Sequence, residues 1–157
     1  MGLKIKIISI GRVKQSFVLD GEAEFKKRLK ALAHLEFLEI DSDRFSSLSD
    51  LEVMRKEAEL FLERVGKEEY LVVLDPGGKS LSSPGFSSML GDTMNRGISA
   101  LTFAIGGALG WDESVKKRAN LLLSLSAMTF PHQMTRLILV EQIYRALTIL
   151  RGMPYHK

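Results

Sequence analysis

Residues 98–110 read Ile-Ser-Ala-Leu-Thr-Phe-Ala-Ile-Gly-Gly-Ala-Leu-Gly. An apolar run from Ile98 to Ile105 ends directly on a turn that contains Gly106, Gly107 and Gly110. A short apolar run bounded by glycine is typical of a buried strand. Glycines in such a turn let a ligand approach the main chain and use its N–H groups. A tight turn that needs a positive φ would use the same residues, so the motif alone leaves both interpretations open.

Short apolar runs of the same kind recur along the chain. They cover Lys4–Ile10, Leu35–Ile40, Tyr70–Leu74 and Leu121–Leu125, in addition to the run that ends at Ile105. Segments with helical periodicity separate these runs, and strands that alternate with helices build a parallel sheet with helices on both faces. We therefore predict a three-layer α/β fold with a mostly parallel sheet.

One helix is marked by signals at both ends. Ser49-x-x-Glu52 is a capping box, and Gly66 is placed to end a helix that runs from Ser49 to Val65. The apolar residues at helical spacing predict the face that packs on the sheet. They are Leu51, Met54, Ala58, Leu62 and Val65.

Two further helices follow in the second half of the chain. Ser83 as N-cap, with Pro84 at the first helical position, marks the start of one of them. The last helix is predicted from about Thr135 to Arg151, and it carries more apolar residues than one stripe against one core requires. We therefore expect this helix to be buried on two sides, one of them against a second copy of the chain, so that the protein is a homodimer.

The composition limits the class of protein. The chain has 157 residues, 45% hydrophobic and 26% charged, which suits one domain over residues 1–157. Cysteine is absent, which excludes disulfides, thiolate nucleophiles and zinc–thiolate sites and fits a reducing compartment. No apolar run reaches about eighteen residues, and Lys4 and Lys6 interrupt the N-terminal apolar stretch. We expect a cytoplasmic protein without membrane association.

Positive charge is concentrated near the C-terminus. Residues 115–157 hold seven Lys or Arg and a single acid, Glu141, and are therefore +6, although the whole chain is only +3. This asymmetry predicts a localised face that binds a polyanion such as RNA.

Two more loops follow predicted strands. Asp75–Lys79 is rich in glycine, and Ser126–Gln133 combines hydroxyl groups with Met128 and Phe130. The carboxyl ends of parallel strands meet at one edge of the sheet, which is where open α/β sheets bind their ligands. Together with the glycine turn after Ile105, these loops suit an adenosine-like ligand, with main-chain groups for the base and apolar walls for its faces.

Five short blocks link these loops to the C-terminal region. They read Leu74-Asp75-x-Gly77-Gly78-Lys79, Ile105-Gly106-Gly107, Leu125-Ser126-x-Met128-Thr129-Phe130-Pro131-His132, Glu141-Gln142-x-Tyr144-Arg145-Ala146 and Pro154-Tyr155-His156. In this order, and over nearly the whole chain, they resemble the 23S rRNA pseudouridine N3-methyltransferases of the SPOUT superfamily. The resemblance implies an α/β domain whose C-terminal part forms a trefoil knot, a topology that is very rare in proteins.

The resemblance also implies a function and a cofactor site. The expected reaction is methylation of N3 of a pseudouridine in 23S rRNA, within the large subunit or the whole ribosome, with S-adenosylmethionine as methyl donor. The residues implied to bind the donor are Leu74, Gly106, Leu125, Ser126, Ala127, Met128, Thr129 and Phe130. Ala108 and Leu109 depart from relatives that carry Pro or Ser and then a polar residue, which puts a polar side-chain contact from this turn in doubt.

The chemistry of the acceptor suggests the catalytic residues. Methylation at N3 needs the imide proton removed and requires no metal. A guanidinium stabilises the imide anion, which makes Arg145 and Arg136 candidates. Tyr144 and His156 lie in the family-like blocks and are candidates to accept or relay the proton. The predicted catalytic residues are therefore Tyr144, Arg145 and His156, and the histidines show no metal-ligand spacing.

Structural interpretations of the same residues remain open. Tyr144 would then only pack between the last helix and a partner, Arg145 would pair with Glu141, and His156 would belong to a frayed terminus. Two other classes of protein also remain. A ribosome-binding module without catalysis would not bind S-adenosylmethionine, and an ordinary Rossmann methyltransferase would carry its glycine-rich loop after the first strand, where Ser9-Ile10-Gly11-Arg12 lacks the pattern.

Overall fold

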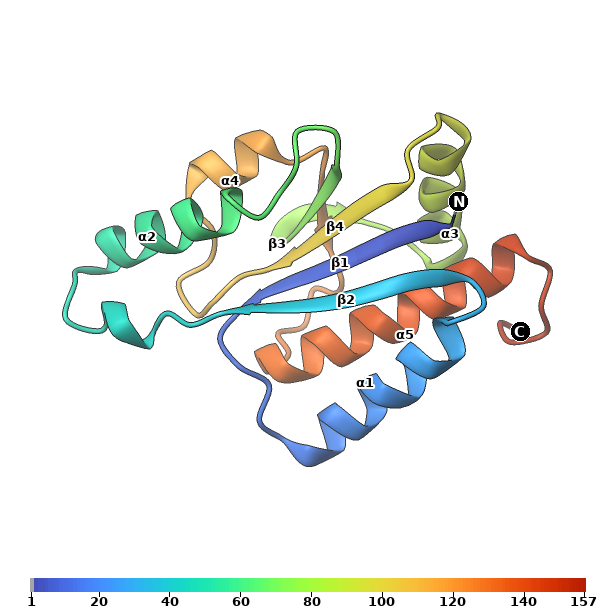
Figure 1. Ribbon diagram of the computed structural model, residues 1–157, viewed down its shortest axis with the longest axis horizontal. Helices are drawn as coiled ribbons and strands as arrows, with labels where there is room; N and C mark the ends of the chain where they lie inside the picture. The colour runs from blue at the N-terminus through green and yellow to red at the C-terminus, as the bar shows by residue number, and fades with distance from the viewer. Residues whose placement is uncertain (1) are drawn as a thin grey trace.

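A computed structural model describes residues 2–157 as a five-stranded sheet with helices packed on its two faces (Figure 1). The strands are β1 (Leu3–Ile10), β2 (Ala33–Ile40), β3 (Tyr70–Ser80), β4 (Ala100–Ile105) and β5 (Leu121–Ser124). The helices are α1 (Ser16–Leu29), α2 (Asp50–Leu62), α3 (Ser83–Asn95), α4 (Glu113–Arg118) and α5 (His132–Leu150), and Asp43–Phe45 form a short 3₁₀ helix, η1. All neighbouring strands are parallel, in agreement with the predicted parallel sheet, and their order is β2-β1-β4-β3-β5.

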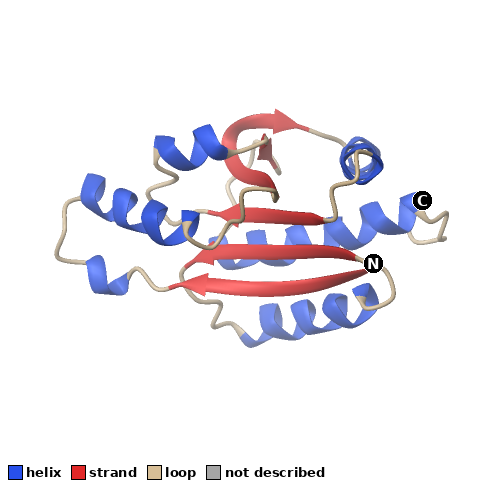
Figure 2. Cartoon of the chain, turned by 45° about the horizontal axis from the view of Figure 1, so that its top comes forward, coloured by secondary structure: helices blue, strands red, loops and turns tan. Residues whose placement is uncertain are grey.

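Each face of the sheet carries its own hydrophobic core, because alternate side chains of a strand point to opposite faces. Ile7 and Phe103, which are register partners on β1 and β4, belong to the core under α1, α3 and α5. Ile8 and Ala104, one residue further along, belong to the core under α2 and α4. Figure 2 shows these helices on the two sides of the strands, which confirms the three-layer prediction.

Helix α5 packs against three neighbours within the chain. It lies on the sheet and is flanked by α1 and α3. Gly21 of α1 and Gly91 of α3 make room for it, since a Cβ atom at these positions would lie 2.8 Å from a methyl carbon of Leu137 and 2.9 Å from one of Leu150. These contacts account for much of the apolar excess of the helix. It begins at His132, three residues before the predicted start, and ends at Leu150.

Two helix predictions need correction. In α2 the Ser49 hydroxyl accepts the N–H of Glu52, as predicted, but the helix ends at Leu62 and not near Gly66. Its buried residues are Glu57, Ala58 and Phe61, and Leu51 of the predicted stripe is exposed. In α3 the N-cap is Ser82, one residue before the predicted Ser83.

The segment Asp75–Lys79, predicted to be a loop, belongs to strand β3. Leu74 and Lys79 both pair with Leu123 of β5, so the four-residue excursion between them leaves the ladder and returns to it. Gly78 is required at the return, because a Cβ atom there would lie 2.6 Å from the backbone of Leu122. The excursion lies beside the carboxyl end of β5.

No helix of residues 2–157 is long and apolar enough to cross a membrane.

Candidate functional site

A cavity of about 1020 Å³ opens at the carboxyl ends of β4 and β5, beside the excursion of β3. Its walls are the start of that excursion (Leu74–Pro76), the glycine turn after β4, the β5–α5 loop and one side of α2. All eight residues implied to bind the methyl donor line it: Leu74, Gly106, Leu125, Ser126, Ala127, Met128, Thr129 and Phe130. Three loops that are far apart in the sequence therefore enclose one space.

The glycine turn after β4 is shaped by a buried tryptophan. Trp111 is 5% exposed, and its ring packs 4.7 Å from that of Phe61. A Cβ atom at Gly106 would lie 3.0 Å from the indole Nε1 of Trp111, so only glycine fits there without displacing the ring. That Nε1 is buried and has no hydrogen-bond partner in residues 2–157. Gly110 has a φ of +80°, so this part of the turn also requires glycine.

The β3 wall of the cavity is fixed by a carboxylate. Asp75 accepts the N–H of Gly77 at 2.9 Å and pairs with Lys116 at 3.2 Å. The Gly77 N–H, together with Lys116, holds the pKa of the Asp75 carboxyl below its usual range. Lys116 also lies 3.8 Å from Glu113, so this cation, which lines the cavity, is already neutralised.

The β5–α5 loop is braced by its own hydroxyl groups. Ser124 donates to the carbonyl of Ser126 at 3.2 Å, and the Ser126 hydroxyl accepts the N–H of Met128 at 3.0 Å. Met128 is nevertheless 75% exposed, an unusual position for a large apolar side chain at the mouth of a cavity. These hydrogen bonds fix the base of the loop, and the exposed Met128 side chain is available for contact with a ligand.

Arg136, one of the two arginines considered for the imide anion, is buried away from the cavity. It forms two hydrogen bonds with the carboxylate of Glu22 and one, at 3.1 Å, with Glu39. Its Nη1 also donates to the hydroxyl of Ser9. The prediction that Arg136 is a candidate for acceptor binding is therefore wrong, because Arg136 is 4% exposed and its guanidinium donates to side chains of the same chain.

The first turn of α5 holds the loop between β1 and α1. The Gln133 side chain accepts the N–H groups of Lys14 and Gln15 at 2.9 and 3.0 Å. His132 lines the cavity and packs over Gly11, and its Nε2 is buried without a partner in the described chain. Burial, with the nearby Arg136 guanidinium, lowers the pKa of His132, so the neutral imidazole is favoured.

The three predicted catalytic residues lie together near the end of α5. Arg145 donates to Glu141 at 2.6 and 2.9 Å, and its Nη1 lies 3.1 Å from Nδ1 of His156. The guanidinium also lies over the ring of Tyr155, which packs edge-on against Tyr144 at 4.8 Å. Tyr144 is 9% exposed, so its ring is part of the core. The pairing of Arg145 with Glu141 and the packing of Tyr144 are both present.

This cluster does not reach the cavity of its own chain. Arg145 follows Thr135, the last α5 residue that lines the cavity, by ten positions, or about 15 Å along the helix axis. Figure 1 shows the C-terminal segment at the end of α5 that is remote from the β5–α5 loop. The predicted donor residues are thus brought together, whereas the predicted catalytic residues form a separate group.

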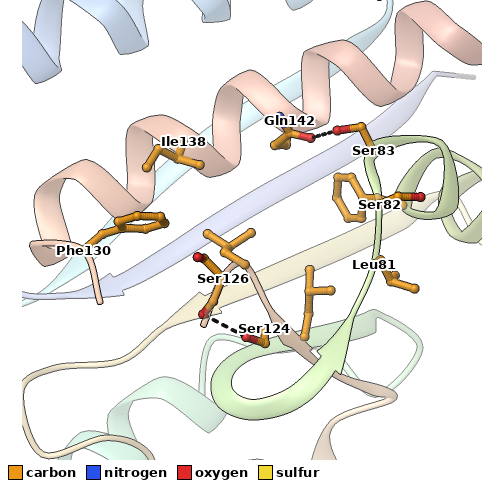
Figure 3. A pocket seen from close by; sticks show the side chains of 11 residues that line it. Leu81, Ser82, Ser83, Ser124, Ser126, Phe130, Ile138 and Gln142 are labelled. Carbon is orange, nitrogen blue, oxygen red and sulfur yellow. Dashed lines mark hydrogen bonds between the residues drawn. The ribbon is translucent and has the colours of Figure 1, made fainter. Parts of the chain in front are cut away.

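A smaller cavity of about 310 Å³ lies between these two groups (Figure 3). It is bounded by the start of α3, the middle of α5 and the β5–α5 loop, and Phe130 and Ile138 form part of its apolar wall. The Ser83 hydroxyl donates to Gln142 at 2.7 Å, and Gln142 donates to Glu141, the partner of Arg145. A polar chain therefore connects the start of α3 to the C-terminal cluster.

The basic C-terminal third is not a single free face. Lys116 is paired with Asp75, and Arg118 donates to the carbonyls of Gly66 and Glu69. The arginines of α5 have carboxylate partners, as described above. The charge asymmetry therefore overstated the surface available to a polyanion, since most of these cations stabilise the fold. No group of three potential metal ligands occurs in residues 2–157.

Sequence reasoning missed several residues that line the cavity, among them Ser42, Glu57 and Trp111. Trp111 follows the glycine turn directly, and this position was a usable signal. The sequence carried no such signal for Glu57 and Ser42, because a glutamate on a helix and a serine in a polar loop are normally solvent-exposed.

Comparison with known proteins identifies the family of this parallel α/β domain. A family model described as "Predicted SPOUT methyltransferase" matches residues 3–156, so the chain belongs to the SPOUT methyltransferase family. It is 40% identical to a protein of Streptococcus equi subsp. zooepidemicus named "Ribosomal RNA large subunit methyltransferase H", over 99% of this chain and 100% of the relative. Proteins with the same name from Streptococcus mutans and Leuconostoc citreum are 42% and 40% identical over the same shares.

Proposed function

We propose that this protein transfers a methyl group from S-adenosylmethionine to N3 of a pseudouridine in 23S rRNA, with the assembled large subunit or ribosome as substrate. The observation that carries the proposal is the single cavity formed by the three strand-end loops in a chain of the SPOUT methyltransferase family. The names of the relatives support ribosomal RNA as the substrate class.

The cavity suits an adenosine-containing methyl donor. Its volume of about 1020 Å³ is at the upper end of the usual range for small-molecule sites. Gly106 and Gly107 are part of its lining, and the side chains of Leu74, Met128 and Phe130 supply apolar surface for a base. The bound donor would supply an electrophilic methyl group.

The C-terminal cluster supplies what the acceptor base requires. The imide of pseudouridine becomes a nucleophile only when its N3 proton is removed, and the anion spreads over two carbonyl oxygens. The Arg145 guanidinium, 26% exposed on its side chain, can stabilise that anion with donors directed away from Glu141. His156 lies at the same guanidinium and is placed to accept or relay the proton.

A homodimer would unite the two groups. About 15 Å of helix separates Arg145 from the cavity in one protomer, whereas methyl transfer needs the reacting atoms about 3–3.5 Å apart. We propose that α5 packs against α5 of a second copy, so that the C-terminal cluster of one protomer lies over the cavity of the other. Partly exposed apolar residues of α5, including Ile138, would contribute to that contact.

RNA would approach the mouth of the cavity from the side of the β1–α1 loop. Arg12 and Lys14 are exposed there, and the loop is held in place by Gln133 and by Glu39, which accepts the N–H of Val13 at 2.7 Å. Cations on a fixed loop suit phosphate contacts, which position RNA without reading its sequence. A chain with so little surface for sequence recognition would depend on the shape of the assembled ribosome.

We infer that the C-terminal part of the chain forms the trefoil knot of the superfamily. The excursion of β3 between its two pairings with Leu123, and the close backbone approach at Gly78, support this inference. A knot of this kind would fix the positions of the segments that form the cavity walls relative to one another.

Mixed dimers provide the test. A Gly106→Leu protomer should lose donor binding because its side chain displaces Trp111, and an Arg145→Ala protomer should lose acceptor stabilisation. Each variant alone should be inactive on ribosomes, and a mixture should recover activity because one of the two cavities in a mixed dimer is intact. Failure of the mixture to recover activity, or a stable monomer in sedimentation at micromolar concentration, would contradict the shared site.

A further inference from the structure

Two glutamates of residues 2–157 are almost completely buried, and only one of them has a cationic partner there. Glu22 is 3% exposed and is neutralised by two hydrogen bonds from Arg136. Glu57 is 4% exposed and takes part in none of the ion pairs formed within residues 2–157. Burying a carboxylate without a counter-charge costs free energy, so the fold alone does not explain the presence of Glu57.

The position of Glu57 relates it to the large cavity. It lies on the inner side of α2 and lines the cavity with Ser42 and Gly107. Its Oε2 is 3.5 Å from where a Cβ atom of Gly107 would be, so the carboxylate lies directly against the glycine turn. Lys116 lines the same cavity but is occupied by Asp75 and Glu113. The carboxylate therefore faces the ligand space without a protein cation to balance it.

The surroundings of Glu57 favour a neutral carboxyl when the cavity holds only solvent. Burial raises its pKa, and hydrogen bonding from the Ser42 hydroxyl opposes this only in part. A ligand that brought N–H or O–H donors to the carboxylate would replace the missing partner, and the ionised form would then be favoured. S-adenosylmethionine carries three groups of this kind: the adenine 6-amino group, the ribose diol and the α-ammonium. Main-chain groups of the loops are expected to hold the adenine, which leaves the ribose diol and the α-ammonium for Glu57.

We propose that Glu57 binds the methyl donor, by accepting hydrogen bonds from either its ribose diol or its α-ammonium group. This proposal rests on the proposed function, because it takes S-adenosylmethionine as the ligand of the cavity. Glu57 thereby becomes a specificity-determining residue supplied by α2, outside the three strand-end loops. Its cost to the unliganded fold is offset when the donor group is bound.

The test compares two substitutions with a matched control on the same helix. Glu57→Gln removes the charge and keeps one acceptor oxygen, and Glu57→Leu removes both. Glu59→Gln, two residues away, alters an exposed carboxylate that pairs only with Lys56 at 3.6 Å. Calorimetric titration measures binding of S-adenosylmethionine, S-adenosylhomocysteine and 5′-methylthioadenosine, and thermal unfolding without ligand measures stability.

If the α-ammonium is the partner, both Glu57 variants lose at least tenfold in affinity for the two amino-acid-containing ligands and none for 5′-methylthioadenosine. If the ribose diol is the partner, Glu57→Leu loses affinity for all three ligands. In both cases Glu59→Gln binds like the wild type, and Glu57→Gln unfolds at the wild-type temperature or above it.

Affinities within twofold of the wild type in both Glu57 variants would overturn the proposal. So would a loss of stability in Glu57→Gln that accompanied the loss of affinity, because that would indicate a structural role. A wild-type protein that binds none of the three ligands would instead refute the proposed function itself.

Discussion

The two arginines of α5 should respond in opposite ways to the same substitution. Arg136 is 4% exposed, and its removal leaves the Glu22 carboxylate, 3% exposed, without a partner. Removing one member of a buried ion pair costs about 3–5 kcal/mol. For a domain of this size, that lowers the melting temperature by on the order of 10 °C.

Arg145 should instead affect activity. Its pair with Glu141 is an i,i+4 pair whose side chains are 26% and 21% exposed, and such pairs contribute at most about 1 kcal/mol to stability. Losing its stabilisation of an imide anion should cost about 3 kcal/mol in the transition state, or roughly a hundredfold in rate. Donor affinity should stay within a few fold, because Arg145 does not line the cavity.

Arg136→Met and Arg145→Met should therefore be measured in parallel. Urea unfolding followed by circular dichroism gives the free energy of unfolding, and single-turnover methyl transfer to ribosomes gives the rate. Glu22→Gln combined with Arg136→Met should recover part of the lost stability, because it removes the orphaned charge. The reasoning is refuted if Arg136→Met costs less than about 1 kcal/mol, or if Arg145→Met keeps the wild-type rate.

Three further predictions concern stability. Gly78→Ala should lower the melting temperature strongly, since its Cβ would lie 2.6 Å from β5 backbone that cannot move aside, and an unchanged temperature would contradict this contact. Because the folded protein holds the pKa of His132 below the ordinary value, the unfolded chain binds more protons, and the stability contributed by neutral His132 is lost as the pH falls through about 6.5 toward the folded value. His132→Gln should flatten that dependence in unfolding curves between neutral and mildly acidic pH. Ser49→Ala should cost about 1 kcal/mol in urea unfolding by removing the acceptor for the Glu52 N–H, and no loss would show that this cap is unimportant.

The sequence predicted the parallel sheet well because its strands are short apolar runs between clear turn residues. It failed at β3, where Asp75-Pro76-Gly77-Gly78 has the composition of a loop but returns to the ladder at Lys79. That return depends on contact with β5, more than forty positions further along, and local propensity carries no information about it.

The candidate site was predicted only in part, again because some of its contacts join residues that are distant in the sequence. The strand-end loops could be assigned to one edge of the sheet because the strands were expected to be parallel. Arg136 was misjudged because its partner Glu22 lies 114 positions away in the sequence. Glu57 was missed because hydrophobic patterning assigns apolar residues to the buried side of a helix, and a carboxylate kept there for a ligand violates that pattern.

Mass spectrometry of the RNA most directly tests the proposed methylation of pseudouridine N3 in 23S rRNA. Ribosomes from cells that lack this protein would be incubated with the purified protein and S-adenosylmethionine carrying an isotopically labelled methyl group. Nuclease fragments of the 23S rRNA would then be sequenced by tandem mass spectrometry. We expect one labelled methyl group on N3 of a single pseudouridine, present only when protein and donor are both added. Absence of label from the RNA, or label on a nucleotide other than pseudouridine, would contradict the proposed function.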